Sequence, residues 1–224
     1  MTFSIVARCA ETGAFGVAVA SSSPAVAARC AYARSGVGAV ASQNVTDPTL
    51  GPRSLDLMTL GASADQAIEV LRGSADQMDY RQVIAVDARG RTAIHSGSKT
   101  LGIWSAAHDE NVACGGNLLA VATVPSAMVK AFTLTRGHLG DRLIAAMRAG
   151  LEAGGEAGPI HSAGFKIVEK VSWPVADLRV DWTEDCPIAG LASLWDMYKP
   201  QMEAYITRAL DPASAPSYGV PSDP

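Results

Sequence analysis

TFSIVAR (residues 2–8) and FGVAVAS (residues 15–21) are the two segments that decide the fold of this chain. Both combine β-branched with small apolar residues, a composition that is typical of buried strands. The residues between them include Gly13, which can adopt the positive φ that a short hairpin loop needs. We therefore predict that the chain opens with a β-hairpin and that its first strand begins at Thr2.

Thr2 directly follows Met1 and stands at the head of this predicted strand. Removal of Met1 would leave a residue with both a hydroxyl nucleophile and a free α-amine, whose ordinary pKa of roughly 7.7–8.0 suits a base near neutral pH. A threonine with a free amine is one of the established forms of nucleophilic catalysis. Threonine is also a good strand former, so its position alone does not separate a catalytic from a structural role.

The composition of the chain excludes several classes of protein. Of its 224 residues, 48% are hydrophobic and 18% are charged, which predicts a packed core and not a disordered chain. The net charge is −4 and the five lysines are widely spaced, so we expect no nucleic-acid binding. Neither a long apolar stretch nor a signal-peptide pattern is found, so we expect no membrane span and a cytoplasmic location.

The histidines and cysteines show no metal-binding pattern. The histidines lack H-x-x-x-H and H-E-x-x-H spacing, so we expect no metal site, and we expect no cofactor. The cysteines lie far apart without a CxxC pair, and we expect buried, reduced side chains at Cys9, Cys30, Cys114 and Cys186.

The rest of the chain alternates between groups of strands and groups of helices. Strand patterns are found at residues 36–43, 82–96, 111–119, 162–168 and 176–181. Helical patterns cover residues 51–73, 125–135, 138–154 and 188–210, and Ser63 with Gln66 forms a capping box inside the first of them. The Pro- and Ser-rich tail, residues 211–224, is expected to be disordered, which leaves residues 1–210 as a single domain.

This order of elements predicts an α+β protein. Hairpins dominate and regular β-α-β alternation is absent, which favours antiparallel sheets with helices packed outside them. A four-layer α-β-β-α sandwich of two antiparallel sheets would bury every apolar face in one domain. A single sheet with helices on one face has the same element order, so the order alone leaves both architectures open.

The GGN sequence at residues 115–117 is the most suggestive polar segment beside Thr2. Glycines let the backbone approach a ligand closely, and Gly116 together with Asn117 could supply N–H donors to an oxyanion. A β-bulge followed by a turn at Asn117 would explain the same residues. Other polar residues near predicted strand ends, where sites are often built, are Arg53, Arg81, His95, Asp109 and His161.

Ten segments of the chain carry a family resemblance: MTFSIVAR, ETGAFGVAVAS, GVGAVASQN, LGPRSLDLM, RQVIAVDARGR, HSGS, GGN, LEAGGEAG, HSAGFKIV and DLRVD. These segments occur in family order from residue 2 to about residue 210. The chain therefore resembles the bacterial family known as domain of unknown function 1028. That family is assigned to the N-terminal nucleophile (Ntn) hydrolase superfamily. Together the segments are specific, although each one alone is weak.

The resemblance implies a four-layer sandwich with Thr2 at the nucleophile position of the superfamily. The Thr2 hydroxyl would attack an amide carbonyl, its α-amine would accept the proton, and Asn117 with the Gly116 N–H would hold the oxyanion. We expect a small amide or peptide-like substrate, contacted by Gln43, Asn44, Arg81, His95, Ser96 and His161. Family members usually carry Gln-Gly-Asn and Gln-Ser-Ala where this chain has residues 115–117 and 161–163, so we expect its substrate contacts to differ.

Two other functions fit the sequence. While Met1 is present, the Thr2 nitrogen is a peptide amide without a basic lone pair, so it could not act as the base. The first alternative to a hydrolase is therefore a binding or assembly protein that has an Ntn-like scaffold but no catalytic activity. A cysteine hydrolase that uses Cys114 with His95 or His161 ranks below both, because no family signature surrounds the cysteine. We also expect a homo-oligomer, such as a symmetric dimer.

Overall fold

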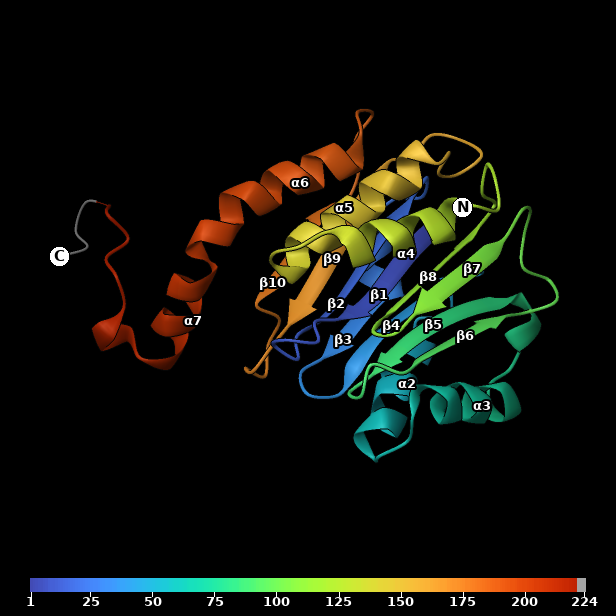
Figure 1. Ribbon diagram of the computed structural model, residues 1–224, viewed down its shortest axis with the longest axis horizontal. Coiled ribbons are helices and arrows are strands. Elements are labelled where there is room, and N and C mark those ends of the chain that lie inside the picture. Colours follow the sequence, from blue (N-terminus) through green and yellow to red (C-terminus); the bar gives the residue numbers. More distant parts are fainter. Residues whose placement is uncertain (221–224) are drawn as a thin grey trace.

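Two antiparallel sheets lie face to face in the computed structural model, which describes residues 1–220 (Figure 1). The larger sheet has six strands in the order β10 (Ala176–Val180), β9 (Ser162–Val168), β2 (Phe15–Ser21), β1 (Thr2–Arg8), β8 (Val112–Asn117) and β7 (Ser105–Asp109). The smaller sheet has four strands in the order β3 (Ala31–Arg34), β4 (Gly38–Asn44), β5 (Arg81–Asp87) and β6 (Thr92–Ser96). The predicted opening hairpin is formed by β1 and β2, at the centre of the larger sheet.

Helices cover the outer face of each sheet, which gives the four layers α-β-β-α (Figure 1). The larger sheet is covered by α4 (Val124–Leu134), α5 (Leu139–Glu152) and α6 (Pro187–Tyr198). The smaller sheet is covered by α2 (Leu50–Thr59) and α3 (Ala64–Ser74). The predicted α+β class and the two-sheet sandwich are therefore confirmed. A short helix that the sequence did not predict, α1 (Val26–Cys30), connects β2 with β3.

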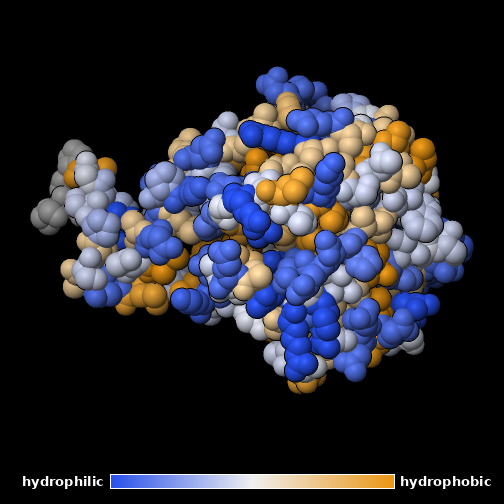
Figure 2. Space-filling view, viewed as in Figure 1, coloured by the Kyte–Doolittle hydropathy of each residue, from blue (hydrophilic) through white to orange (hydrophobic). Residues whose placement is uncertain are grey.

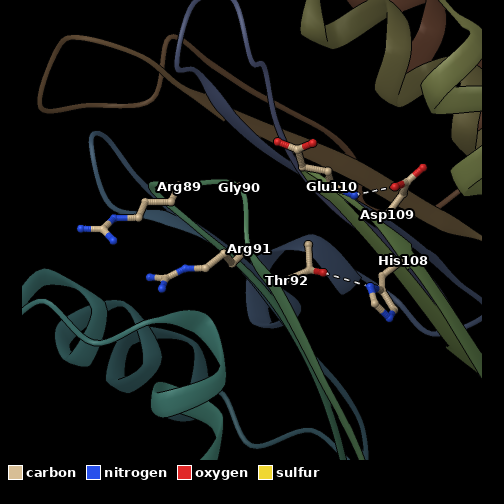
Figure 3. Close-up of a pocket in the computed structure, with 7 residues that line it drawn as sticks. All are labelled: Arg89, Gly90, Arg91, Thr92, His108, Asp109 and Glu110. Atoms are coloured by element: carbon tan, nitrogen blue, oxygen red, sulfur yellow. Dashed lines mark hydrogen bonds between the residues drawn. The ribbon is translucent and has the colours of Figure 1, made fainter.

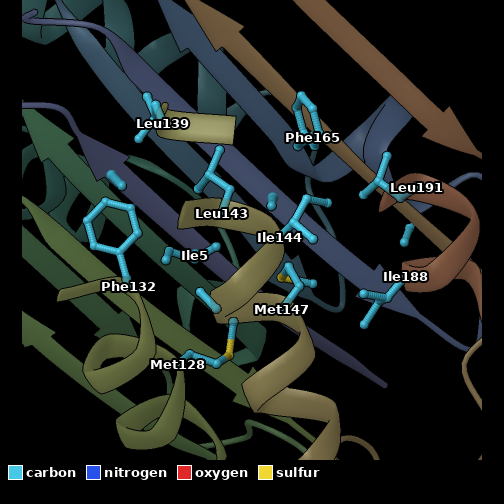
Figure 4. Packing of buried hydrophobic residues seen from close by; sticks show 14 of the residues in the cluster. Ile5, Met128, Phe132, Leu139, Leu143, Ile144, Met147, Phe165, Ile188 and Leu191 are labelled. Carbon is cyan, nitrogen blue, oxygen red and sulfur yellow. The ribbon is translucent and has the colours of Figure 1, made fainter. Parts of the chain in front are cut away.

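Apolar side chains fill all three spaces between the four layers. The largest cluster lies between the six-stranded sheet and its helices, where Ile5 of β1 lies beside Leu143 and Met147 of α5 (Figure 4). Smaller side chains such as Val17 and Ala41 fill the space between the two sheets, and a third cluster lies under α2 and α3. Each fully buried large aliphatic side chain contributes about 1.5–3 kcal/mol relative to an exposed one, so these clusters are the main stabilising element of the fold.

Two capping boxes fix the starts of helices. Ser63 and Gln66 form the predicted box at the start of α3, where the Ser63 hydroxyl accepts the backbone N–H of Gln66 at 3.1 Å. A second box, at the start of α5, pairs His138 with Asp141. The Asp141 carboxylate also accepts the indole N–H of Trp195 at 2.8 Å. Because Trp195 belongs to α6, this hydrogen bond ties α6 to the start of α5.

The helix predicted over residues 188–210 is interrupted in the structure. A 3-10 turn, η2 (Lys199–Gln201), separates α6 from α7 (Met202–Leu210). Pro200 lies in that turn and has no N–H with which to continue the α-helical hydrogen-bond pattern. As a result α7 projects away from the layered body, at the left of the view in Figure 1.

The residues after α7 begin with a 3-10 turn, η3 (Pro212–Ser214). Arg208 of α7 donates to the carbonyl oxygen of Pro216 at 2.9 Å, and its guanidinium lies 3.8 Å from the centre of the Tyr218 ring. The tail that the sequence predicts to be disordered, residues 211–224, thus packs against α7 as far as residue 218. Its last four residues, 221–224, lie outside the described part of the chain.

Hydrophilic and hydrophobic residues are mixed over the face of the molecule drawn in Figure 2. Large exposed apolar side chains are spread over separate elements, as Leu60, Leu134 and Leu210 illustrate. Within residues 1–220, no helix has the length and apolar character needed to cross a membrane.

Candidate functional site

One end of the sandwich brings together the strand ends that carry the predicted site residues. Thr2 opens β1 and is paired with Asn117, the last residue of β8. In the other sheet, Asn44 at the end of β4 is paired with Arg81 at the start of β5. Gln43 connects the sheets at this end, because its Nε2 donates to a carbonyl oxygen of β8 at 3.2 Å.

Thr2 and Asn117 point into the space between the two sheets. Side chains alternate between the two faces of a strand. Phe3 and Ile5 of β1 pack under the helices, whereas Val6 packs between the sheets. Thr2 lies four residues before Val6 and therefore on the same face, opposite Asn117 in the register of β1 and β8. Thr2 is only 6% exposed, so its surroundings are set by the protein and not by bulk water.

A layer of buried amides joins the end of β8 to the smaller sheet. Gln43 Nε2 donates to Oε1 of Gln82 at 2.7 Å, and Gln82 Nε2 donates to the Ser96 hydroxyl at 3.0 Å. Gln82 Nε2 also lies 3.4 Å from the carbonyl oxygen of Gly116. Within residues 1–220, Gln43 Oε1 and Asn117 Nδ2 have no hydrogen-bond partner. Buried polar atoms are normally paired, so these two atoms are candidates for contact with a bound polar molecule.

Three of the predicted substrate contacts face away from Thr2. Asn44, Arg81 and His95 occupy the strand positions whose side chains point to the outer face of the smaller sheet. Asn44 Nδ2 and His95 Nε2 lie 2.5 and 2.9 Å from carbonyl oxygens of the 3-10 turn η1 (Met78–Tyr80). Arg81 donates to a backbone carbonyl in the loop after β4. The structure therefore gathers these residues at the same end of the sandwich as Thr2 but does not bring their side chains to it.

Thr2 lies next to a second hydroxyl, that of Ser21 at the end of β2. The two Oγ atoms are 3.4 Å apart. Both hydroxyls donate to the carbonyl oxygen of Met1, and the bond from Ser21 is 2.5 Å long. A hydroxyl donor aimed at a carbonyl oxygen, as Ser21 is, is suited to stabilise the negative charge that develops on that oxygen during nucleophilic attack.

A hydrogen-bond chain connects Ser21 to a cation. The Arg29 guanidinium donates to the Ser23 hydroxyl at 2.7 Å, and the Ser23 and Ser21 hydroxyls are 2.8 Å apart. The Ser23 backbone N–H also donates to Ser21 Oγ, at 3.1 Å. Since the Ser21 hydroxyl donates to the Met1 carbonyl, its oxygen is left to accept from the Ser23 N–H and the Ser23 hydroxyl. The positive charge of Arg29 thus polarises the donor that faces the carbonyl.

Glu156 is a buried carboxylate beside these hydroxyls. It lies in the loop between α5 and β9 and is 5% exposed. Its Oε2 accepts the backbone N–H of Ser22 at 3.1 Å, whereas its Oε1 has no hydrogen-bond partner in the part of the chain that is described. Burial raises the pKa of Glu156 to about 7, although the α-ammonium group of residue 1 and hydrogen bonds from Ser22 favour its charged form.

The start of β9 holds the turn after β2 in place. Ser162 Oγ donates to a carbonyl oxygen of that turn at 2.6 Å, and the backbone N–H of His161 donates to the Ser21 carbonyl at 2.9 Å. The His161 ring is engaged elsewhere, because its Nδ1 lies 2.9 Å from the Thr183 carbonyl and the ring stacks on Trp182. The structure therefore brings the backbone of His161 to the site, and gives its ring a structural contact.

Cys114 meets neither histidine of the cysteine-hydrolase hypothesis. It is fully buried in the core under the helices, and this burial raises the pKa of its thiol well above the usual value. His95 lies on the outer face of the opposite sheet, and the His161 ring contacts the Thr183 carbonyl. A raised pKa disfavours the thiolate that would attack a substrate, so the structure argues against this hypothesis.

Four residues of this site were not predicted from the sequence: Ser21, Ser23, Arg29 and Glu156. One local signal was available, because residues 21–23 are three consecutive serines directly after a predicted strand. Nothing in the local pattern singled out Glu156. Its contact with Ser22 spans 134 residues of sequence and follows from the order of strands in the sheet, which spacing alone does not give.

A cavity of about 480 Å³ lies at the opposite end of β1 and β8 (Figure 3). It is formed by the β5–β6 and β7–β8 turns, and its walls are Arg89, Gly90, Arg91, Thr92, His108, Asp109 and Glu110. None of the residues around Thr2 lines it. Within residues 1–220, no group of three or more His, Cys, Asp or Glu side chains is placed to hold a metal ion.

Comparison with known proteins gives one strong match. A family model described as "Family of unknown function (DUF1028)" matches residues 2–191. The crystal structure of protein SPO2555 from Silicibacter pomeroyi, from the same family model, is similar with a TM-score of 0.83 and 29% identity, over 88% of this chain and 86% of that chain. No curated protein matches this sequence.

Two solved structures of Anbu proteins are more distant. Anbu (ancestral beta-subunit) from Yersinia bercovieri is 12% identical with a TM-score of 0.39, over 91% of this chain and 97% of its own. A Gly-1 mutant of Anbu from Hyphomicrobium sp. strain MC1 is 11% identical with the same TM-score and the same shares of both chains. Similarity at this level assigns neither a function nor a site.

Proposed function

The chain belongs to the DUF1028 family of unknown function, and we propose that it is an amide hydrolase of the N-terminal nucleophile type. In this proposal the nucleophile is Thr2, which becomes the first residue when Met1 is removed, and the substrate is a small amide or peptide-like molecule. One observation carries the proposal: the hydroxyls of Thr2 and Ser21 converge on a carbonyl oxygen, that of Met1. A substrate carbonyl bound in the same way would lie beside the Thr2 hydroxyl.

The first chemical step is attack by Thr2 Oγ on the substrate carbonyl carbon. The free α-amine of Thr2 takes the hydroxyl proton, because nucleophile and base belong to one residue. Negative charge then develops on the carbonyl oxygen, where the Ser21 hydroxyl donates. Asn117 Nδ2, which has no partner in residues 1–220, is the second donor in the proposal. A single donor of this kind changes a rate about 100- to 1,000-fold.

The second half of the reaction releases both products. The Thr2 ammonium gives its proton to the leaving nitrogen as the carbon–nitrogen bond breaks, which leaves an ester on Thr2 Oγ. Water then attacks the ester, with the Thr2 amine as the base, and the acid is released while the hydroxyl is restored. The reaction consumes one water molecule and needs no cofactor.

Protein that lacks Met1 is the material for the test. The chain is produced together with a methionine aminopeptidase, and intact-mass spectrometry verifies that Thr2 is the first residue. Turnover of a panel of amino-acid and acyl p-nitroanilides is then compared between protein with and without Met1. We expect turnover only after Met1 removal, because the acylated Thr2 nitrogen has no basic lone pair.

Variants of β1 provide the control. Thr2→Ala should lower kcat at least about 1,000-fold, whereas Thr2→Ser keeps a hydroxyl and should retain measurable turnover. Ser4→Ala is the matched control, because Ser4 lies on the same face of β1 and its hydroxyl has no partner within residues 1–220. Undiminished turnover in Thr2→Ala, or in protein that keeps Met1, would refute the mechanism.

The second candidate is a binding or assembly protein that uses the same end of the sandwich without catalysis. It is favoured by the burial of Thr2 and by the hydrogen bond from the Thr2 hydroxyl to the Met1 carbonyl oxygen, which together keep the hydroxyl from a substrate while Met1 is present. This candidate predicts the same ligand affinity for Thr2→Ala and for the unchanged protein in calorimetric titrations. A cytoplasmic location and a homodimer remain part of both proposals.

A further inference from the structure

Met1 occupies the Thr2 site in the manner of an acyl group. Its carbonyl oxygen accepts the hydroxyl protons of Thr2 and Ser21. An acyl group on the Thr2 nitrogen and one on the Thr2 hydroxyl oxygen lie close together in space, because the acyl group can pass from one atom to the other through a five-membered cyclic intermediate. The surroundings of Met1 therefore resemble those of the acyl group that the proposed hydrolysis would place on Thr2 Oγ.

The Glu156 carboxylate belongs to the loop that borders this acyl group, because the same loop carries Gly158, against which the Met1 side chain lies. Glu156 Oε2 is fixed by the Ser22 N–H, the residue next to Ser21, and Oε1 is buried without a partner in the described chain. The positive charge of the residue 1 ammonium acts on Glu156 and favours its carboxylate form. A buried carboxylate with one unpaired oxygen is stabilised by a cationic partner, and an ammonium group supplies up to three donors.

The side chain of this acyl group lies against a glycine. The Met1 thioether packs over Gly158, where an added Cβ would lie 3.3 Å from Met1 Cε and 3.8 Å from its sulfur. Gly158 follows Glu156 by two residues, so one loop carries both the unpaired carboxylate oxygen and the glycine beside the Met1 side chain. The absence of a side chain at residue 158 leaves space for an unbranched apolar group.

We propose that the substrates of this site are α-aminoacyl amides, that is, amino-acid amides or short peptides with a free α-amino group next to the bond that is cleaved. Glu156 binds the substrate ammonium, Ser21 binds the carbonyl oxygen, and Gly158 leaves room for an apolar side chain. This inference rests on the proposed function, because it assigns a substrate class to the same Thr2 site.

The reaction on such a substrate is a simple hydrolysis. Thr2 Oγ forms a bond to the aminoacyl carbon, the carbon–nitrogen bond breaks, and the leaving amine takes the proton held by the Thr2 α-amine. Water then cleaves the aminoacyl ester and releases an amino acid with a free carboxylate. The substrate ammonium stays on Glu156 throughout and takes no part in the proton transfers.

Three p-nitroanilides that share one side chain test the proposal with Met1-free protein. They are the anilides of L-methionine, of N-acetyl-L-methionine and of 4-(methylthio)butanoic acid, which lacks the amine. We expect kcat/KM for the free amine to exceed that of either analogue by about 30-fold or more, the effect of one buried charge pair. Glu156→Gln should lower this ratio by about 30-fold, mainly through KM. Glu152→Gln, an exposed glutamate at the end of α5, should leave the ratio unchanged.

Calorimetric titration with L-methioninamide separates this inference from the proposed function. If all three anilides resist cleavage, the hydrolase proposal fails, and binding of L-methioninamide that Glu156→Gln weakens still supports the ammonium site. If the three anilides are cleaved equally well, or Glu156→Gln leaves their ratio unchanged, the hydrolase proposal stands and this inference is overturned. Gly158→Val supplies an independent variant. It should raise KM for the methionine anilide relative to the glycine anilide, and an unchanged KM ratio counts against a substrate side chain that lies beside Gly158.

Discussion

Glu156→Gln should change how the stability of the protein depends on pH. Burial raises the pKa of Glu156 from its usual 4.5 to about 7. Between these values the folded protein binds more protons than the unfolded chain. The contribution of this group to the free energy of unfolding is therefore fully present below pH 4.5 and is lost as the pH rises through 7. At 1.36 kcal/mol per pH unit, this interval corresponds to about 3 kcal/mol.

Urea unfolding at pH 4.5, 6, 7 and 8 measures this effect. Relative to Glu156→Gln, which cannot titrate, the unchanged protein should lose about 3 kcal/mol of unfolding free energy between pH 4.5 and pH 8. For a protein of this size the loss equals a difference of roughly 6–12 °C in Tm. Glu152→Gln, whose carboxylate is exposed, should run parallel to the unchanged protein over the whole range. Parallel curves for Glu156→Gln as well would show that Glu156 is not the buried titrating group and would refute the reasoning.

Four further substitutions test packing and the site. Gly73→Ala should raise the free energy of unfolding by about 0.5–1 kcal/mol, because a Cβ there meets no atom within 4 Å and alanine favours helix. Gly51→Ala should lower the free energy of unfolding, because its Cβ would lie 2.1 Å from the Tyr32 ring. Equal effects of the two substitutions in urea unfolding would contradict this reasoning. Leu143→Ala should cost about 2–5 kcal/mol by calorimetry, and a cost below about 1 kcal/mol would contradict its fully buried position in α5. Ser21→Ala in Met1-free protein should lower kcat about 100-fold with KM little changed, and an unaltered kcat would exclude this hydroxyl as the oxyanion donor.

The sequence predicted the parts of the fold that rest on local patterns. The hairpin of residues 2–21, the Ser63 capping box and the helices on both sheets follow from periodicity and from capping residues. β3 and β7 were missed for a physical reason: β3 has only four residues, and β7, with the sequence SAAHD, contains no β-branched residue. These segments are strands because of the neighbours with which they pair, and pairing is not visible in a single segment.

The candidate site divides in a similar way. Thr2 and Asn117 could be selected because both stand at strand ends, and the structure pairs them across β1 and β8. The face of the sheet to which the His95 side chain points could not be predicted in the same way, because a shift of one residue along a strand moves a side chain to the other face. The position of Glu156 in the site could not be predicted from the sequence, because its partner Ser22 is distant in sequence and comes near only when β9 pairs with β2.

The place of β1 in the larger sheet has a consequence for the entropy of the proposed reaction. Chain ends usually fray, and a nucleophile at a frayed end would have to be ordered each time a substrate binds. Here the first strand is bonded to β2 on one side and to β8 on the other, so the order of Thr2 is provided by folding. Amide hydrogen exchange at Phe3 and Ser4 should accordingly be as slow as in the centre of the sheet. Once Met1 is removed, a terminus held in this way would behave as a rigid interior position that carries a free amine.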